Sequence, residues 1–154
     1  MKNTVFNNNI YIEYPDDFYE MSAAEISEYF AGDMLRCAFK NAEKHVILSL
    51  AKTNASLLNM ITDAKSVLNG AENSLKKNLK NYVCTERFDA EVFGKKAKGI
   101  CFEYTANTGE KQFCEMTVVK FERCFYTAYC MSRLDAKDQF KTLFASFRAA
   151  LKKV

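Results

Sequence analysis

Catalysis by a nucleophile and a general base is the first chemistry to test, because its common forms need a histidine. The chain has one histidine, His45, which follows Lys44 at the start of a β-favouring run. That position is ordinary for a structural residue. Cys37, on the preceding predicted strand, is the thiol that could pair with it if it acted as a base. We assign no catalytic residues and expect a protein without enzymatic activity.

Six cysteines could indicate disulfides or a metal site, but their spacing favours neither. They form no C-x-x-C pair, whereas zinc sites usually contain closely spaced ligands. We therefore expect reduced thiols packed as small apolar side chains, no metal and no cofactor. One pairing remains open: if a tight turn near Glu122 joins the last two strands, Cys114 and Cys130 lie nearly opposite each other, within reach of oxidation. The cysteines are Cys37, Cys84, Cys101, Cys114, Cys124 and Cys130.

Proteins that bind phosphate groups or nucleic acid usually carry sequence features that this sequence lacks. Five glycines do not form a Walker or dinucleotide-binding loop. The sequence pI is about 8.5, below the value of about 9 that duplex-binding domains exceed. We expect no nucleic-acid partner, although two groups of lysines would form a basic face if they met. These groups are Lys76, Lys77 and Lys80, and Lys95, Lys96 and Lys98.

The length and composition of the chain indicate one globular domain over residues 1–154. Hydrophobic residues make up 49% of the sequence and charged residues 27%, which is typical of folded proteins. No apolar run reaches the roughly 18 residues that a membrane helix needs. The first nine residues contain asparagines where a signal peptide needs an apolar segment. We therefore expect a cytoplasmic protein without a membrane partner.

The first half of the sequence predicts two β-hairpins and a short helix. Three asparagines at 7–9 separate two β-favouring stretches and indicate a turn. Ser22 and Glu25 have the spacing of a capping box, which predicts a helix to about Ala31, followed by the left-handed stop that Gly32 favours. Two further strands are expected over residues 34–40 and 44–52, the second with Val46, Leu48 and Leu50 on one face.

The second half predicts a long helix, a four-stranded meander and a final helix. Apolar residues at spacings of three and four indicate a helix over residues 55–82. From 85 to 133 the period is two, and residues 125–130 are apolar on both faces, as in a central strand. Asp135 is a good N-cap for the last helix. The predicted fold class is α+β, with a mostly antiparallel sheet of eight strands flanked by three helices.

The opening and closing stretches of the sequence resemble the PsbP-like fold superfamily. Residues 10–18 are similar to its opening strand, proline turn and phenylalanine, and residues 125–129 and 140–147 are similar to its final strand and helix. The superfamily includes a photosystem assembly subunit, a Ran-GTPase-binding factor and many small bacterial proteins without assigned activity. The resemblance implies an α/β/α sandwich and a role as a binding or assembly factor. It carries over no site residue, because no functional motif of the group matches.

We therefore expect a non-catalytic protein-interaction domain whose partner is another protein. The alternative is a small-ligand-binding domain, or a minor enzyme, with a pocket between the sheet and the long helix. The interaction surface to test first combines aromatic and acidic side chains near the N-terminus, because exposed aromatics beside carboxylates often mark interfaces. This surface comprises Tyr11, Glu13, Tyr14, Asp16, Asp17, Phe18, Tyr19 and Glu20.

Overall fold

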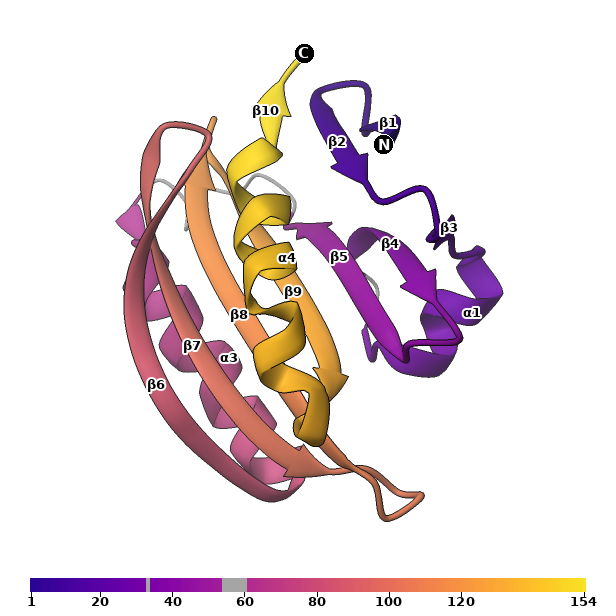
Figure 1. Cartoon of the computed structure of the whole chain (residues 1–154). Coiled ribbons are helices and arrows are strands. Elements are labelled where there is room, and N and C mark those ends of the chain that lie inside the picture. The colour runs from indigo at the N-terminus through magenta and orange to yellow at the C-terminus, as the bar shows by residue number, and fades with distance from the viewer. Residues whose placement is uncertain (33, 54–60) are drawn as a thin grey trace.

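A seven-stranded antiparallel sheet forms the centre of the computed structural model, which describes residues 1–32, 34–53 and 61–154 (Figure 1). Its strand order is β3-β4-β5-β9-β8-β7-β6, and a three-stranded sheet with the order β1-β2-β10 lies beside it. The strands are β1 (Lys2–Phe6), β2 (Ile10–Tyr14), β3 (Tyr19–Glu20), β4 (Leu35–Asn41), β5 (Val46–Lys52), β6 (Lys80–Val92), β7 (Lys95–Thr105), β8 (Lys111–Phe121), β9 (Cys124–Arg133) and β10 (Lys152–Lys153).

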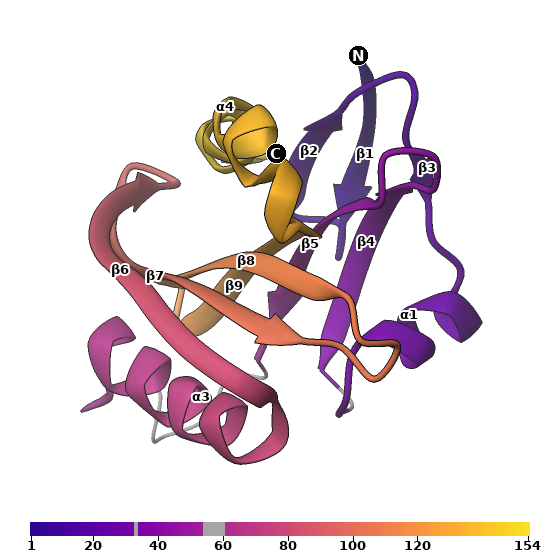
Figure 2. The ribbon, with the colours of Figure 1, turned by 60° about the horizontal axis from the view of Figure 1, so that its bottom comes forward.

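Helices cover both faces of the large sheet (Figure 2). One face carries α4 (Lys137–Ala150), and the other carries α3 (Ala64–Asn78). The short α1 (Ala23–Tyr29) lies beside β4. This arrangement confirms the predicted α+β class and the α/β/α sandwich. Within the described ranges, no helix is long and apolar enough to cross a membrane.

The alternation of side chains along the central strands builds two apolar cores. On β5, Val46, Leu48 and Leu50 are buried in the core under α4, whereas Ile47 belongs to the core under α3. This confirms the predicted faces of the strand. The strand β9 lies fourth in the order of seven and is buried on both sides, as its apolar sequence predicts.

Two local predictions near the N-terminus are confirmed by backbone geometry. Asn7 and Asn8 have φ values of +52° and +55° in the turn that pairs β1 with β2. Asparagine tolerates this left-handed region better than most residues. At α1, the hydroxyl of Ser22 accepts from the backbone N–H of Glu25 at 3.2 Å, and the carboxylate of Glu25 accepts from the N–H of Ser22 at 3.1 Å.

The prediction of one helix over residues 55–82 is wrong in the part that the structure describes, because Thr62 and Asp63 are not helical and the helix ends before Tyr82. Residues 55–60 lie outside the described residues. The helix α3 begins after Asp63, whose side chain accepts from the backbone N–H of Ser66 at 2.8 Å. It ends at Asn78, because Leu79 is extended and the chain continues as β6. Tyr82 keeps the helical spacing in the sequence but lies on this strand, where its ring packs at 5.2 Å from that of Phe102.

Two further predictions need correction. Asp135 is not the N-cap of the last helix, because a 3₁₀ turn over Leu134–Ala136 precedes α4 and Ala136 occupies the cap position without a side-chain hydrogen bond. The eight predicted strands also omit β3 and β10. Each of these has two residues, too few to produce a recognisable period.

A buried carboxylate fixes α3 to β6. Glu72 accepts a hydrogen bond from the hydroxyl of Tyr82 at 2.7 Å and forms an ion pair with Arg87. Burial alone raises the pKa of Glu72, but the hydrogen bonds from Arg87 and Tyr82 outweigh it, so its pKa lies below the ordinary glutamate value. Folding therefore favours the ionised form of this carboxyl group.

Acid should weaken the attachment of α3 through Glu72. Because the pKa is lowered in the folded protein, its stabilisation is fully present above about pH 4.3, the ordinary glutamate value, and is lost as the pH falls through the lower folded value. Glu72→Gln should reduce the free energy of unfolding by about 1–3 kcal/mol at pH 7 and less at pH 3. Urea unfolding at both pH values measures this. Glu91→Gln, at an exposed site on β6, is the control; an equal loss from Glu72→Gln at both pH values would contradict the prediction.

Candidate functional site

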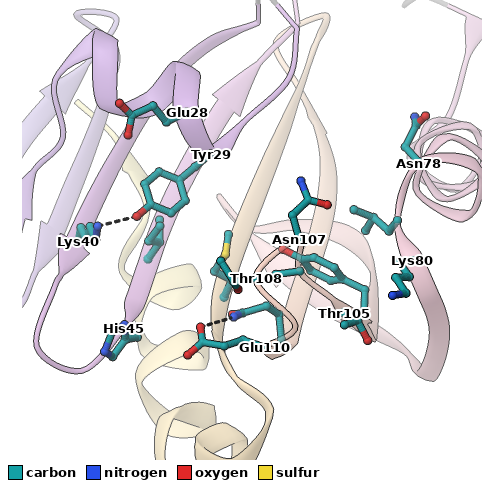
Figure 3. A pocket seen from close by; sticks show the side chains of 16 residues that line it. Glu28, Tyr29, Lys40, His45, Asn78, Lys80, Thr105, Asn107, Thr108 and Glu110 are labelled. Atoms are coloured by element: carbon teal, nitrogen blue, oxygen red, sulfur yellow. Dashed lines mark hydrogen bonds between the residues drawn. The ribbon is translucent and has the colours of Figure 1, made fainter.

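An open cleft of about 460 Å³ lies on the α3 face of the sheet, beside the β7–β8 hairpin (Figure 3). Its walls come from the end of α1, the turn between β4 and β5, the junction of α3 with β6, and the β7–β8 hairpin. Segments far apart in the sequence therefore build one site. Its volume falls within the range of about 300–1,000 Å³ that is typical of ligand sites.

The floor of the cleft is apolar because of the strand register. Lys40 on β4 pairs with Ile47 on β5, and Ile47 pairs with Met131 on β9. Residues opposite one another on paired strands point to the same face. Ile47 and Met131 are buried, and Leu79 and Tyr104 add partly buried apolar surface. Burial raises the pKa of the Tyr104 hydroxyl, so this side chain stays neutral.

The α1 wall presents an aromatic ring held by a cation. Lys40 donates a hydrogen bond from Nζ to the hydroxyl of Tyr29 at 2.6 Å, and its ammonium lies 4.7 Å from the centre of that ring. This hydrogen bond raises the pKa of Lys40. Tyr19, which pairs with Lys40 across β3 and β4, donates to Glu25 at 2.9 Å. Tyr19 is 40% exposed and Tyr29 is 43% exposed, so two aromatic rings meet solvent at this rim.

The opposite wall is the turn of the β7–β8 hairpin. The backbone N–H of Ala106 donates to the carbonyl of Glu110 at 2.8 Å, and that of Gly109 donates to the carbonyl of Ala106 at 2.9 Å. Gly109 has a φ of +89°, which glycine adopts without strain. The turn directs Glu110 into the site (Figure 3), where its carboxylate also lies 3.5 Å from the amide of Gln112.

A guanidinium group joins two of these walls. Nη2 of Arg133, at the end of β9, lies 3.0 Å from Oε1 of Glu110 and 3.0 Å from Nε2 of His45. Because a guanidinium only donates, Nε2 of His45 acts as the acceptor. Nε of Arg133 is buried and has no hydrogen-bond partner among the described residues. His45 is therefore part of a polar network at one end of the cleft.

The structure does not bring His45 and Cys37 together. Cys37 pairs with Leu50, several residues along the hairpin from the turn that holds His45. Its Sγ lies 3.8 Å from the carbonyl of Leu50. Burial raises the pKa of this thiol to about 12, so it is a poor nucleophile. The two residues cannot form the catalytic pair considered from the sequence.

The predicted proximity of Cys114 and Cys130 is also wrong. The register of β8 and β9 pairs Cys114 with Met131 and Cys130 with Glu115. A difference of one residue places side chains on opposite faces of a sheet, and the two thiols indeed lie in different cores. All six cysteines are free. Burial raises the pKa of Cys114 to about 12.

The predicted interaction surface divides into buried and exposed residues. Tyr14 and Phe18 lie in the core under α4, and Tyr14 stacks on Phe39 with ring centres 4.2 Å apart. Tyr11 is partly buried and donates to Glu13 at 3.2 Å. The other residues of the surface, Asp16, Asp17, Tyr19 and Glu20, are exposed. Of the four rings, Tyr19 is therefore the best placed to meet a partner, and it adjoins the cleft through Lys40.

The two groups of lysines do not meet. Lys80 begins β6 and Lys95 begins β7 at the far end of the same hairpin, a separation of about 40 Å for a strand of this length. Lys98 is paired with Asp89 at 2.6 Å. Among residues 1–32, 34–53 and 61–154, no group of three histidine, cysteine or acidic side chains is arranged to hold a metal ion.

Most residues of the cleft were not identified from the sequence. Tyr29 belongs to α1, Tyr104 to β7 and Glu110 to the turn after β7, and no motif links them. Lys40 and Met131 occupy strand positions whose importance depends on which strands become neighbours. The one signal of the cleft available in the sequence was Tyr29, a tyrosine near the end of a short helix with a capping box.

Comparisons with known proteins identify the fold. No protein-family model and no curated protein matches the chain. Among solved structures, it is similar to cyanobacterial PsbP (CyanoP) from Synechocystis, with a TM-score of 0.69 and 10% identity over 99% of this chain and 92% of that one. It is also similar to LpqN of Mycobacterium tuberculosis, a protein involved in cell envelope biogenesis, with a TM-score of 0.55 and 16% identity over 94% and 83% of the two chains.

A third similar structure is a protein of unknown function from Pseudomonas aeruginosa described as a putative regulator. Its TM-score is 0.54, with 11% identity over 95% of this chain and 94% of that one. All three likenesses extend over nearly the whole of this chain. The protein therefore has a PsbP-like fold, as its opening and closing segments indicated.

Proposed function

We propose that this protein is a non-catalytic binding domain that holds an extended segment of a partner protein in the cleft beside the β7–β8 hairpin. The observation that carries the proposal is the lining of the cleft. An apolar floor of Ile47, Met131 and Tyr104 lies between walls that offer amide, hydroxyl and charged groups. Apolar contact supplies affinity in such sites, and a few polar groups fix orientation.

The exposed tyrosines support a protein partner. Tyr19 and Tyr29 flank Lys40 at the rim of the cleft, and tyrosine is enriched among the residues that dominate protein interfaces. The rim extends the site from the cleft floor onto the exposed part of the predicted interaction surface. A small ligand would fill the cleft, which Tyr29 lines, and leave Tyr19 uncovered.

A small-molecule ligand is the second candidate function. The volume of the cleft, about 460 Å³, accommodates a compound of ordinary size. The cleft also lies on the side of the sheet that carries α3, the side on which the alternative interpretation of the sequence placed a ligand pocket. The two candidates differ in their dependence on the rim outside the cleft, because only a protein segment should need Tyr19, which is not among the residues that line the cleft.

Peptide selection tests the proposal. A random peptide library displayed on phage is screened against the immobilised protein, and the affinities of enriched peptides are measured by fluorescence anisotropy. Tyr29→Ala should weaken binding at least about tenfold, the effect of losing a tyrosine anchor at an interface. Tyr11→Ala is the control, because this tyrosine lies on β2, where Lys152 covers its ring at 4.7 Å.

Two results would contradict the protein-segment proposal. One is a library that yields no binding peptide. The other is a set of peptides that bind Tyr29→Ala as tightly as the unchanged protein. Binding of small molecules without binding of peptides would instead favour the second candidate.

We also propose that the protein works in a reducing compartment such as the cytoplasm. Its thiols support this: Cys101, Cys114, Cys124 and Cys130 are buried separately as small apolar side chains, and none of the six cysteines is paired. Disulfides are common in exported proteins, which fold in oxidising surroundings.

A further inference from the structure

We infer that the partner segment carries an acidic group, and that Glu110 occupies the place of that group on Arg133 in the free protein. This inference rests on the proposed function and specifies the chemistry of its partner. It concerns one end of the cleft, where Arg133, His45 and Glu110 meet.

The hydrogen bonding of Arg133 is incomplete. A guanidinium presents Nε and the neighbouring Nη as a planar fork that fits both oxygens of a carboxylate. Glu110 contacts Nη2 at 3.0 Å, and the buried Nε has no hydrogen-bond partner among the described residues. Buried donors without a partner are rare in folded proteins. If Glu110 and the side chain of Arg133 move, a carboxylate that enters from the cleft and binds both nitrogens would satisfy this donor.

The carboxylate of Glu110 is weakly held by Arg133. Glu110 belongs to the turn of the β7–β8 hairpin, and its side chain is 46% exposed. Ion pairs that are open to solvent contribute little to stability. Rotation of this side chain into solvent would therefore release Arg133 at small cost and leave the backbone of the turn in place.

The remaining charges of the cleft favour an acidic ligand. Lys40 and Lys80 line two different walls, and within the described part of the chain neither forms an ion pair. Once Glu110 has turned away, the two lysines and the neighbouring Arg133 outnumber the one remaining carboxylate of the lining, that of Glu28. Such a balance attracts an acidic segment and disfavours a basic one.

The test compares selections with the unchanged protein and with Arg133→Gln. Peptides selected by the unchanged protein should be enriched in aspartate and glutamate relative to the starting library, and this enrichment should vanish with Arg133→Gln. An acidic peptide should bind the unchanged protein at least about tenfold more tightly than its counterpart with asparagine and glutamine, as expected for loss of a charged partner. Arg133→Gln should reduce this preference to about twofold or less.

Removal of the competing carboxylate gives an independent result. Glu110→Gln should increase the affinity for the acidic peptide by about two- to fivefold, because the ligand no longer displaces an exposed ion pair. The controls are Lys98→Gln and Asp89→Asn, which make the same charge changes at the exposed pair on β6 and β7 and should leave binding unchanged.

The inference is overturned if selected peptides show no acidic enrichment, or if acidic and amide peptides bind equally. Sensitivity to Tyr29→Ala distinguishes the two proposals. Peptides that need Tyr29 and show no acidic preference leave the proposed function intact and remove this inference alone. Peptides that do not need Tyr29 remove both. Thermal unfolding of each variant shows whether its fold is retained.

Discussion

Arg148→Ala should lower the free energy of unfolding by about 3–5 kcal/mol, the usual cost of leaving one member of a buried ion pair without its partner. Nη1 of Arg148 on α4 donates to Oε2 of Glu115 on β8 at 2.7 Å, and the two side chains are only 14% and 11% exposed. Removal of the guanidinium leaves the carboxylate of Glu115 under the helix, where water cannot fully solvate it. Urea unfolding followed by circular dichroism measures the loss.

A double variant and an exposed pair serve as controls. Arg148→Met combined with Glu115→Leu should recover most of the stability, because apolar residues of similar size often replace a buried pair at little cost. Lys141→Ala breaks the exposed pair with Asp138 on the same helix and should cost less than about 1 kcal/mol. A loss below about 1 kcal/mol for Arg148→Ala would show that Glu115 is solvated in the folded protein.

Phe102→Ala should also lower the free energy of unfolding by about 3–5 kcal/mol, as expected for removal of a buried phenylalanine ring. Phe102 is fully buried under α3, and its ring centre lies 5.2 Å from that of Tyr82, 5.9 Å from that of Tyr129 and 6.3 Å from that of Tyr104. Because Tyr104 also lines the cleft, the variant should weaken peptide binding as well as folding.

The matched variant is Phe102→Leu, which retains most of the apolar volume and should cost less than about 1.5 kcal/mol. Peptide affinity measured well below the melting temperature separates the effect on the cleft from the effect on stability. Unchanged affinity in Phe102→Ala would show that Tyr104 keeps its position without this support.

Local patterns predicted the elements of this fold well. The alternation in β5 determined which residues face α4, and the apolar residues on both faces of β9 predicted a central strand. The capping box at Ser22 predicted the start of α1. These signals depend on residues close together in the sequence, which is why they could be identified without a structure.

Predictions that depended on exact ends or on register were less successful. The helical spacing of apolar residues continues to Tyr82 although α3 ends at Asn78, because a side chain on an adjoining strand can pack into the same core as the helix. The predicted pairing of Cys114 with Cys130 was wrong by one residue in the register of β8 and β9. In a sheet, a shift of one residue moves a side chain to the opposite face.

The cleft could not be predicted, because it depends on the strand order. The strand β5 pairs with β9 across more than 70 intervening residues. This pairing is what makes neighbours of Lys40, Ile47 and Met131. The interaction role of the surface predicted near the N-terminus stays a prediction. The structure places Tyr14 and Phe18 in the core and leaves Tyr19 at the rim of the cleft.

Chemical-shift mapping with a selected peptide tests the location of the binding site most directly. Backbone amide signals of the ¹⁵N-labelled protein are followed as the peptide is added. We predict that the largest changes occur at Tyr29, Ile47, Tyr104 and Met131, with little change at Phe88 and Asp89 in the middle of β6. Changes that concentrate on α4 or on β2, with the signals around the cleft unaffected, would contradict the proposed site.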